Sequence, residues 1–167
     1  TASYHPLTLA SLFFLFSILG WILETLSYLT MEGVFLNRSI LLGPWIPLYG
    51  ICGVLSVTML HRFAKNPILA FCMNGLLYSV IGYLSDFTVQ MIWHADLHKI
   101  SQYFRPSLLP PFFADAVFLG LIGCTCQYFI APKWKQVTRK IPLWFLLCVC
   151  VLLGMLMLLD VFFAFYR

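Results

Sequence analysis

The sequence predicts an all-α protein, a polytopic bundle of about five transmembrane helices that forms a single domain over residues 1–167. The chain is 62% hydrophobic and only 10% charged, whereas a soluble domain carries about 25% charged residues. Its apolar residues also come in long blocks, close to the ~20 residues that a helix needs to cross a bilayer. So few charges cannot cover a water-soluble surface. The basic residues stand at block ends, which is typical of membrane proteins and does not indicate a nucleic-acid partner.

The predicted spans are justified in order by length and by their start signals. A proline stands at or beside four of the expected starts, where a missing N–H has no cost: Pro44, Pro67, Pro111 and Pro142. The spans are expected over residues 7–30, 44–60, 67–93, 112–130 and 141–165.

Two short connectors are basic and predict the orientation. Short connectors rich in Lys and Arg stay cytoplasmic, so we expect a cytoplasmic N-terminus. The cations are Arg62 and Lys65 after the second span, and Lys133, Lys135, Arg139 and Lys140 after the fourth.

The other two connectors do not resemble solvent loops. Residues 31–43 read MEGVFLNRSILLG, which is too apolar for water and too short for a span, so we expect a re-entrant or interfacial segment shielded by protein. Residues 95–105 place Leu97, Ile100 and Phe104 on one face. This pattern predicts a short interfacial helix that ends before Pro106.

A polar stripe follows the first span and predicts a functional site. Its residues recur at steps of three and four, so they share one helical face, which must look into the bundle or a cavity. Glu24 lies inside the apolar block, where a carboxylate is costly unless it is protonated or paired. We interpret it as part of a substrate, ion or proton site; a structural ion pair or a shallow, hydrated position is the alternative. The stripe comprises Ser17, Gly20, Trp21, Glu24, Ser27 and Tyr28.

The third span carries a second polar stripe, with Asp86 as a second intramembrane carboxylate. We expect the two stripes to face each other across one polar cavity. The alternative is a helix-packing seam, because small residues such as Gly82 let another helix approach closely. The stripe comprises Gly75, Tyr78, Ser79, Gly82, Ser85, Asp86 and Gln90.

Arg38, beside Asn37, is the expected counter-charge. A buried guanidinium would pair with Glu24 or Asp86, or form two hydrogen bonds to an anionic headgroup, carboxylate or phosphate. Alternatively, it is an interfacial arginine that reaches toward water.

Residues 43–50 read GPWIPLYG, in which Trp45 and Tyr49 would supply an aromatic wall and a hydroxyl at a pocket rim. A plain helix start with a packing motif is the alternative.

Three segments together resemble a known family. They are Gly20-Trp21-Ile22-Leu23-Glu24, then Phe35-Leu36-Asn37-Arg38, then Gly43-Pro44-Trp45-Ile46-Pro47-Leu48-Tyr49-Gly50. This pattern, over about the first third of the chain, is similar to that of the Putative ABC-transporter type IV (CmpB-like) family of small bacterial membrane proteins.

The resemblance implies a transport-related, permease-like protein in a bacterial cell membrane, and it makes eight residues family motif positions. The chain departs from the family where Ser39 replaces a usual glycine, and where Trp93-His94-Ala95-Asp96 replaces a Trp-Asp-Tyr-Ser run. The motif positions are Glu24, Asn37, Arg38, Gly43, Pro44, Pro47, Tyr49 and Gly50.

Other candidates are weaker. His94 and His98 have metal-ligand spacing without an obvious third ligand, and most of the six cysteines lie in spans, where Cys fills apolar space. Asp115 and Asp160 lie near span ends, where we expect them to be hydrated. We expect no metal and no cofactor. The predicted binding residues are Glu24, Asn37, Arg38, Trp45, Tyr49, Tyr78, Asp86 and Gln90.

Three functions fit these features. We favour transport or binding of a small solute at an intramembrane site built on Glu24, Asp86 and Arg38. The sequence has no P-loop, so energy would come from an ion gradient or a partner, and we expect a homo-oligomer or a second membrane subunit besides the lipids. The alternatives are an intramembrane enzyme with Glu24 or Asp86 as base, acting on a lipid-linked or anionic amphipathic substrate, and a non-catalytic assembly subunit.

Overall fold

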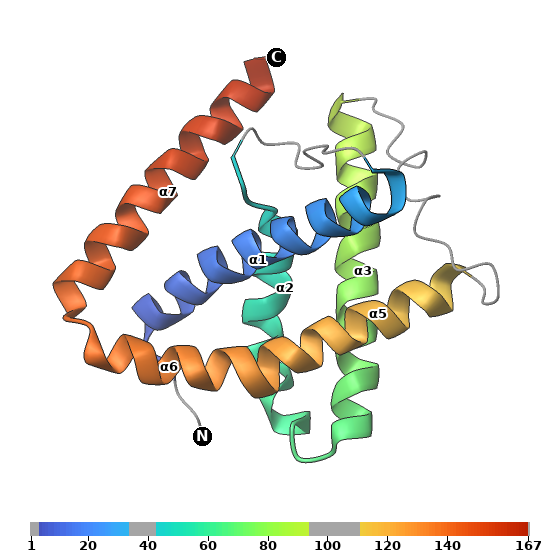
Figure 1. The fold of residues 1–167 in the computed structure, drawn as a ribbon, viewed down its shortest axis with the longest axis horizontal. Coiled ribbons are helices and arrows are strands. Elements are labelled where there is room, and N and C mark those ends of the chain that lie inside the picture. Colours follow the sequence, from blue (N-terminus) through green and yellow to red (C-terminus); the bar gives the residue numbers. More distant parts are fainter. Residues whose placement is uncertain (1–3, 34–42, 94–110, 167) are drawn as a thin grey trace. The chain divides into compact units, whose positions relative to one another are not determined.

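The computed structural model describes residues 4–33, 43–93 and 111–166. The all-α prediction is confirmed, because these ranges contain helices and no strand. Figure 1 shows the helices, which are α1 (Pro6–Glu32), α2 (Pro47–Thr58), the 3₁₀ turn η1 (Leu60–Phe63), α3 (Pro67–Trp93), α5 (Pro111–Thr125), the π-helical segment η3 (Cys126–Ile130), α6 (Ala131–Lys140) and α7 (Leu143–Tyr166).

Three helices are long and apolar enough to cross a membrane: α1, α3 and α7. Each has 24 to 27 residues, which at 1.5 Å per residue exceeds the ~30 Å of a hydrocarbon core. The predicted second span is longer than its helix, because α2 has only 12 residues and begins at Pro47. The residues before α2 form a turn instead: Trp45 N donates to the Gly43 carbonyl, and Ile46 N donates to the Ser17 carbonyl of α1.

The structure tests the predicted connectors only in part. Helix α1 ends at Gly33, whose φ of 68° is the left-handed conformation that glycine adopts readily at a helix end. The rest of the predicted re-entrant segment and the predicted interfacial helix at 95–105 lie outside the described residues. The basic connector between the fourth and fifth spans is itself a helix, α6.

The chain divides into two compact units. The first unit comprises Thr1–Val54 and Ala131–Arg167, and the second comprises Leu55–Ile130. The start of α2 therefore belongs to the first unit and its end to the second. The expectation of one domain over the whole chain stays a prediction.

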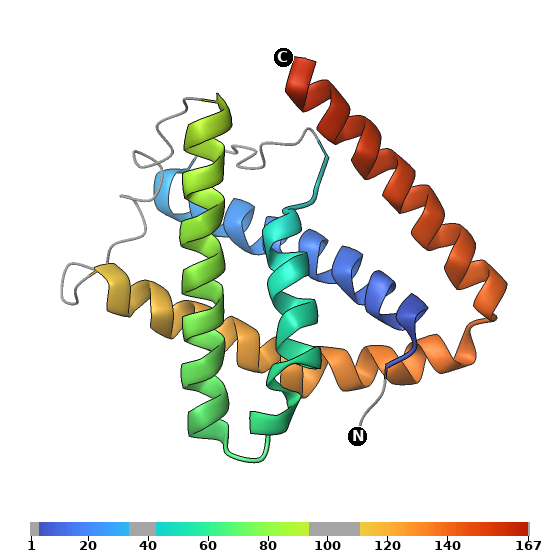
Figure 2. The same ribbon diagram turned by 180° about the vertical axis from the view of Figure 1, so that it is seen from behind.

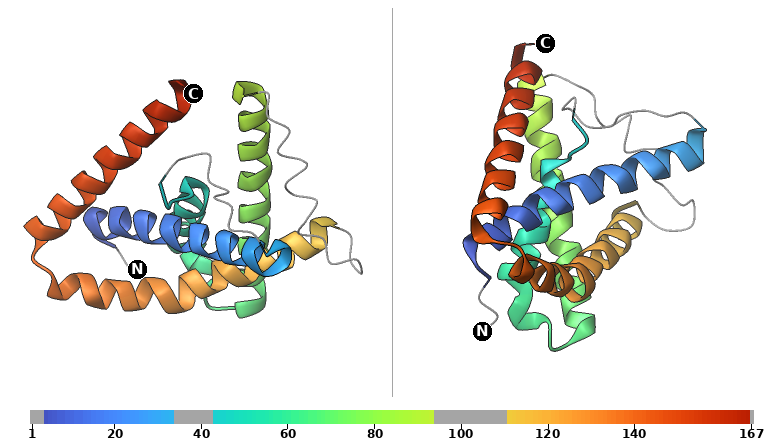
Figure 3. Two further views of the ribbon diagram at one scale, coloured as in Figure 1. Left: turned by 45° about the horizontal axis from the view of Figure 1, so that its top comes forward. Right: turned by 60° about the vertical axis from the view of Figure 1, so that its left-hand side comes forward.

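In the first unit, α1 packs against α6, α7 and the start of α2. The first part of α7 lies beside the start of α1, after the sharp bend that follows α6 (Figure 3). Glycines allow the approach of α2 to α1: a Cβ on Gly20 would overlap the Tyr49 ring, and one on Gly53 would overlap the Phe16 ring. The buried side of α1 is rich in small polar residues and also includes Leu12 and Phe16; its buried hydroxyls are Thr8, Ser11, Ser17 and Thr25.

In the second unit, α3 and α5 cross in close contact (Figure 2). A Cβ on Gly123 would lie 2.6 Å from the Asn74 Cβ, so glycine permits this crossing. Asn74 is fully buried there and donates to the Ala70 carbonyl at 2.8 Å and to Gln127 Oε1 at 3.0 Å, while it accepts from Ser56 Oγ. Gln127 in turn donates to the Leu60 carbonyl at 3.1 Å. We call Ser56, Asn74 and Gln127 the Asn74 network.

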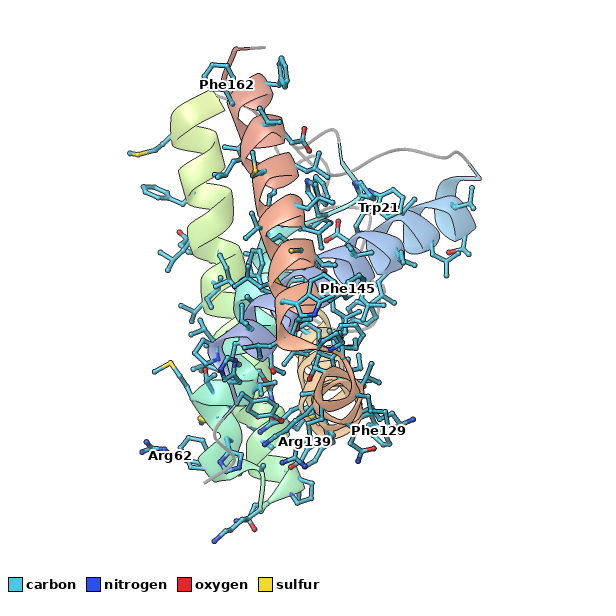
Figure 4. All side chains as sticks on the ribbon, turned by 90° about the vertical axis from the view of Figure 1, so that its left-hand side faces the viewer. Trp21, Arg62, Phe129, Arg139, Phe145 and Phe162 are labelled. Carbon is cyan, nitrogen blue, oxygen red and sulfur yellow. The ribbon has the colours of Figure 1, made fainter. Side chains whose placement is uncertain are left out.

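Large apolar side chains cover the outside of α7. Only 11% of the most apolar 18-residue stretch of α7 is buried. Phe145 and Phe162, near the two ends of the helix, are 48% and 56% exposed (Figure 4). Such a surface is stable in hydrocarbon and not in water. The exposure supports a membrane location for α7.

We predict that Gly50→Ala destabilises the protein, whereas Gly82→Ala does not. A Cβ at Gly50 would lie 2.7 Å from the Phe13 ring and backbone oxygen, whereas one at Gly82 would meet open space. Overpacking costs about 1–3 kcal/mol, while alanine gains up to ~1 kcal/mol over glycine in a helix. Thermal unfolding in detergent measures both variants, and equal melting temperatures would contradict the close α1–α2 packing.

Candidate functional site

The structure brings three of the predicted site residues together in the first unit. Glu24 is on α1, Trp45 precedes α2, and Tyr49 is in the first turn of α2. Tyr78, Asp86 and Gln90 are on α3, in the second unit, and Asn37 and Arg38 lie outside the described residues. The structure does not describe the side chains of Asp86 and Gln90. The predicted facing of Glu24 and Asp86 therefore stays a prediction.

Glu24 and Tyr49 form the centre of the site. The Tyr49 hydroxyl donates to Glu24 Oε1 at 3.0 Å. Tyr49 is only 8% exposed, and its ring lies against Gly20, one helical turn before Glu24. Glu24 itself is half-buried. The two family motif segments thus meet, because glycine at position 20 leaves room for the tyrosine that reaches the carboxylate.

Asp160 holds the segment that precedes Tyr49. Its Oδ2 accepts hydrogen bonds from Gly43 N at 2.7 Å and from Trp45 Nε1 at 3.0 Å. Asp160 is 8% exposed, as is Trp45. The prediction that Asp160 is simply hydrated is therefore wrong: its carboxylate accepts from the half-buried Gly43 N–H and from the Trp45 indole, which would otherwise be buried without an acceptor.

Residues 43–49 are consequently held at both sides. Asp160 of α7 binds Gly43 and Trp45, and the Ser17 carbonyl of α1 accepts from Ile46 N at 3.0 Å. The carbonyl at position 17 can accept this extra bond because a carbonyl has two lone pairs. These contacts fix the start of α2 and with it the position of Tyr49 against Glu24.

Thr25 adds an unsatisfied polar group next to Glu24 in the chain. Its side chain is 6% exposed, and its hydroxyl has no hydrogen-bond partner among the residues that the structure describes. A buried hydroxyl without a partner costs about 1–3 kcal/mol. This cost would be relieved by a water molecule or a bound polar group.

Sequence reasoning missed Asp160 and the Asn74 network. The signal for Asp160 was present, because a carboxylate in so apolar a helix is a functional candidate by the same rule that selected Glu24. Asn74 and Gln127 are uncharged, and nothing in their spacing shows that a π-helical segment would bring them together. Tyr78, a predicted site residue, lies with the Asn74 network in the second unit and is 3% exposed.

The site in the first unit suits a polar or cationic group. Glu24 offers a carboxylate, and Trp45 and Tyr49 offer aromatic rings, whose faces attract cations. Within residues 4–33, 43–93 and 111–166, no three His, Cys, Asp or Glu side chains form a group that could hold a metal ion.

Comparison with known proteins extends the motif resemblance over most of the chain. Residues 11–165 match the family model described as Putative ABC-transporter type IV. The match contains Glu24, the whole 43–50 segment and Asp160. No curated protein and no solved structure matches the chain.

We predict that Asp160→Ala lowers the free energy of unfolding by about 1–3 kcal/mol, because it leaves the buried Trp45 indole and the half-buried Gly43 N–H without their acceptor. Asp160→Asn keeps one carbonyl oxygen and should lose less. Trp45→Phe removes a single donor and should also lose less. Chemical or thermal unfolding in detergent ranks the three variants, and a wild-type value for Asp160→Ala would show that this carboxylate does not hold the segment.

Proposed function

The chain belongs to the Putative ABC-transporter type IV family, and we propose that it is a membrane transport or substrate-binding subunit that takes a small polar solute at Glu24 and Tyr49. The family and the three long apolar helices make it a transporter-related membrane protein. The binding of a solute at Glu24 and Tyr49 is what we propose in addition.

The hydrogen bond between Tyr49 and Glu24 carries the proposal. An intramembrane carboxylate is costly, and such groups are kept mainly where they do chemistry or binding. Glu24 is half-buried, so it is neither sealed in a core nor spread on the lipid surface. The tyrosine hydroxyl at 3.0 Å orients the carboxylate, and orientation before binding lowers the entropic cost of holding a ligand.

The neighbouring groups fit a solute with hydrogen-bond donors or a positive charge. The Glu24 carboxylate accepts from the Tyr49 hydroxyl, and the Tyr49 ring lies against Gly20, one turn earlier on α1. Arg38 and Asp86, predicted from the sequence as partners of Glu24, belong to the same proposal. The sequence contains no P-loop, so we propose that an ion gradient or a second subunit supplies the energy.

A non-catalytic assembly subunit is the second candidate, and one observation favours it. Only 11% of the most apolar 18-residue stretch of α7 is buried, which leaves a long apolar face for lipid or for a partner helix. Under this function Glu24 and Tyr49 would only fix the packing of α1 against α2. The two candidates differ in whether the protein retains a solute.

We predict that Glu24→Gln reduces solute retention about tenfold or more without loss of stability. Glutamine keeps an oxygen for the Tyr49 hydroxyl but removes the charge, and hydrogen bonds to charged groups contribute about 1.5–3 kcal/mol. The protein is equilibrated with a metabolite extract in detergent, washed, and its bound small molecules are quantified by mass spectrometry. Tyr49→Phe should reduce retention less.

Tyr83→Phe is the matched control, because Tyr83 is 74% exposed on α3 and should behave as wild type. Retention that is equal in wild type and Glu24→Gln, at equal melting temperature, would contradict the proposed solute site and favour the assembly function.

A further inference from the structure

Helix α6 differs in chemistry from every long helix of the chain. Its ten residues, APKWKQVTRK, contain four of the ten Lys and Arg residues of the protein and no Asp or Glu. The solute site described above does not involve this helix. Such a concentration of one charge on a short amphipathic helix indicates a binding surface for an anion.

Contacts with the start of α1 fix which side of α6 faces outward. Trp134 Nε1 donates to Ser11 Oγ at 2.9 Å, and Ala131 and Thr138, on the same face, are buried. The Lys135 ammonium lies 4.7 Å from the centre of the Tyr4 ring. Burial raises the pKa of the Tyr4 phenol, and the face of this aromatic ring attracts the cation.

The remaining cations of α6 are exposed. Lys133, Arg139 and Lys140 lie on the outward part of the helix and are all accessible. Because Trp134 anchors the opposite side, α6 cannot roll to bury them without losing the bond to Ser11. The helix therefore presents a fixed basic surface, which we call the α6 basic face and define by Lys133, Arg139 and Lys140.

The start of α7 sets the depth of this face relative to a membrane. Leu143, Trp144 and Phe145 follow α6 directly and are 59%, 68% and 48% exposed. Figure 4 shows Arg139 beyond the Phe145 end of α7, on the opposite side from Phe162. A 24-residue apolar helix is long enough to cross the hydrocarbon core, so its end at residue 143 reaches the headgroup level. Exposed Trp is typical of that level.

We propose that the α6 basic face binds the headgroups of anionic phospholipids. Its three cations stand next to side chains that must contact lipid, so phosphates lie within reach of them wherever the protein is inserted. No acidic residue on α6 opposes the attraction, and guanidinium and ammonium groups both bind phosphate oxygens. This inference does not depend on the proposed solute site.

The test compares lipid selectivity in two matched double variants of the full chain. Arg139→Gln/Lys140→Gln removes one Arg and one Lys from α6, and Arg62→Gln/Lys65→Gln removes one of each from the other basic connector, where both are exposed. Each protein is mixed with equal amounts of phosphatidylglycerol and phosphatidylcholine in detergent, and native mass spectrometry measures the bound ratio of the two lipids.

We expect the phosphatidylglycerol preference to fall about fivefold or more in the α6 variant and to stay near wild type in the connector variant. The charge-preserving variant Arg139→Lys/Lys140→Arg should keep the preference, and added salt should weaken it in the wild type. An unchanged ratio in the α6 variant would overturn the proposal. Equal losses in both double variants, or a loss in the charge-preserving one, would also overturn it.

Discussion

The acceptor role of Asp160 is the constraint on which the first unit depends. One carboxylate oxygen accepts from Gly43 N and from Trp45 Nε1, and the indole would otherwise be buried without an acceptor. In hydrocarbon, every backbone and side-chain donor must find an acceptor inside the protein. The turn at residues 43–46 is irregular backbone, so it needs partners from other helices. Asp160 of α7 and the Ser17 carbonyl of α1 are two of them.

The fixed turn then explains the geometry of the candidate site. It starts α2 at Pro47, which places Tyr49 against Gly20 and its hydroxyl on Glu24. Glycines at 20, 50 and 53 allow this approach, because a Cβ at any of them would overlap α1 or α2 side chains. The Gly-Trp-x-x-Glu and Gly-Pro-x-x-Pro-x-Tyr-Gly segments are thus two halves of one contact. Together they supply the Glu24 carboxylate, the tyrosine hydroxyl that donates to it, and the aromatic side chains of Trp45 and Tyr49.

The second unit meets the same constraint with neutral groups. Asn74 is fully buried and is satisfied by Ala70, Ser56 and Gln127. Gln127 lies in the π-helical segment η3, and such segments are frequent where a helix must place a side chain that regular geometry would turn away. Helix α6 follows the opposite rule, since its cations need water or headgroups and remain exposed. Asn74 and Asp160 are thus satisfied by protein groups, whereas Lys133, Arg139 and Lys140 of α6 remain exposed.

The sequence by itself determined the membrane class, the long apolar helices and the family, because these follow from apolar block length, proline positions and short motifs. It also selected Glu24, since polar residues on one helical face must avoid lipid, and it selected Trp45 and Tyr49 from the GPWIPLYG segment. It did not select Asp160, because its partners lie 115 and 117 residues away in the chain. Only the tertiary structure decided that pairing, the short α2 and the Asn74 network. The physical reason is that hydropathy depends on neighbours in sequence, whereas the satisfaction of a buried donor depends on neighbours in space.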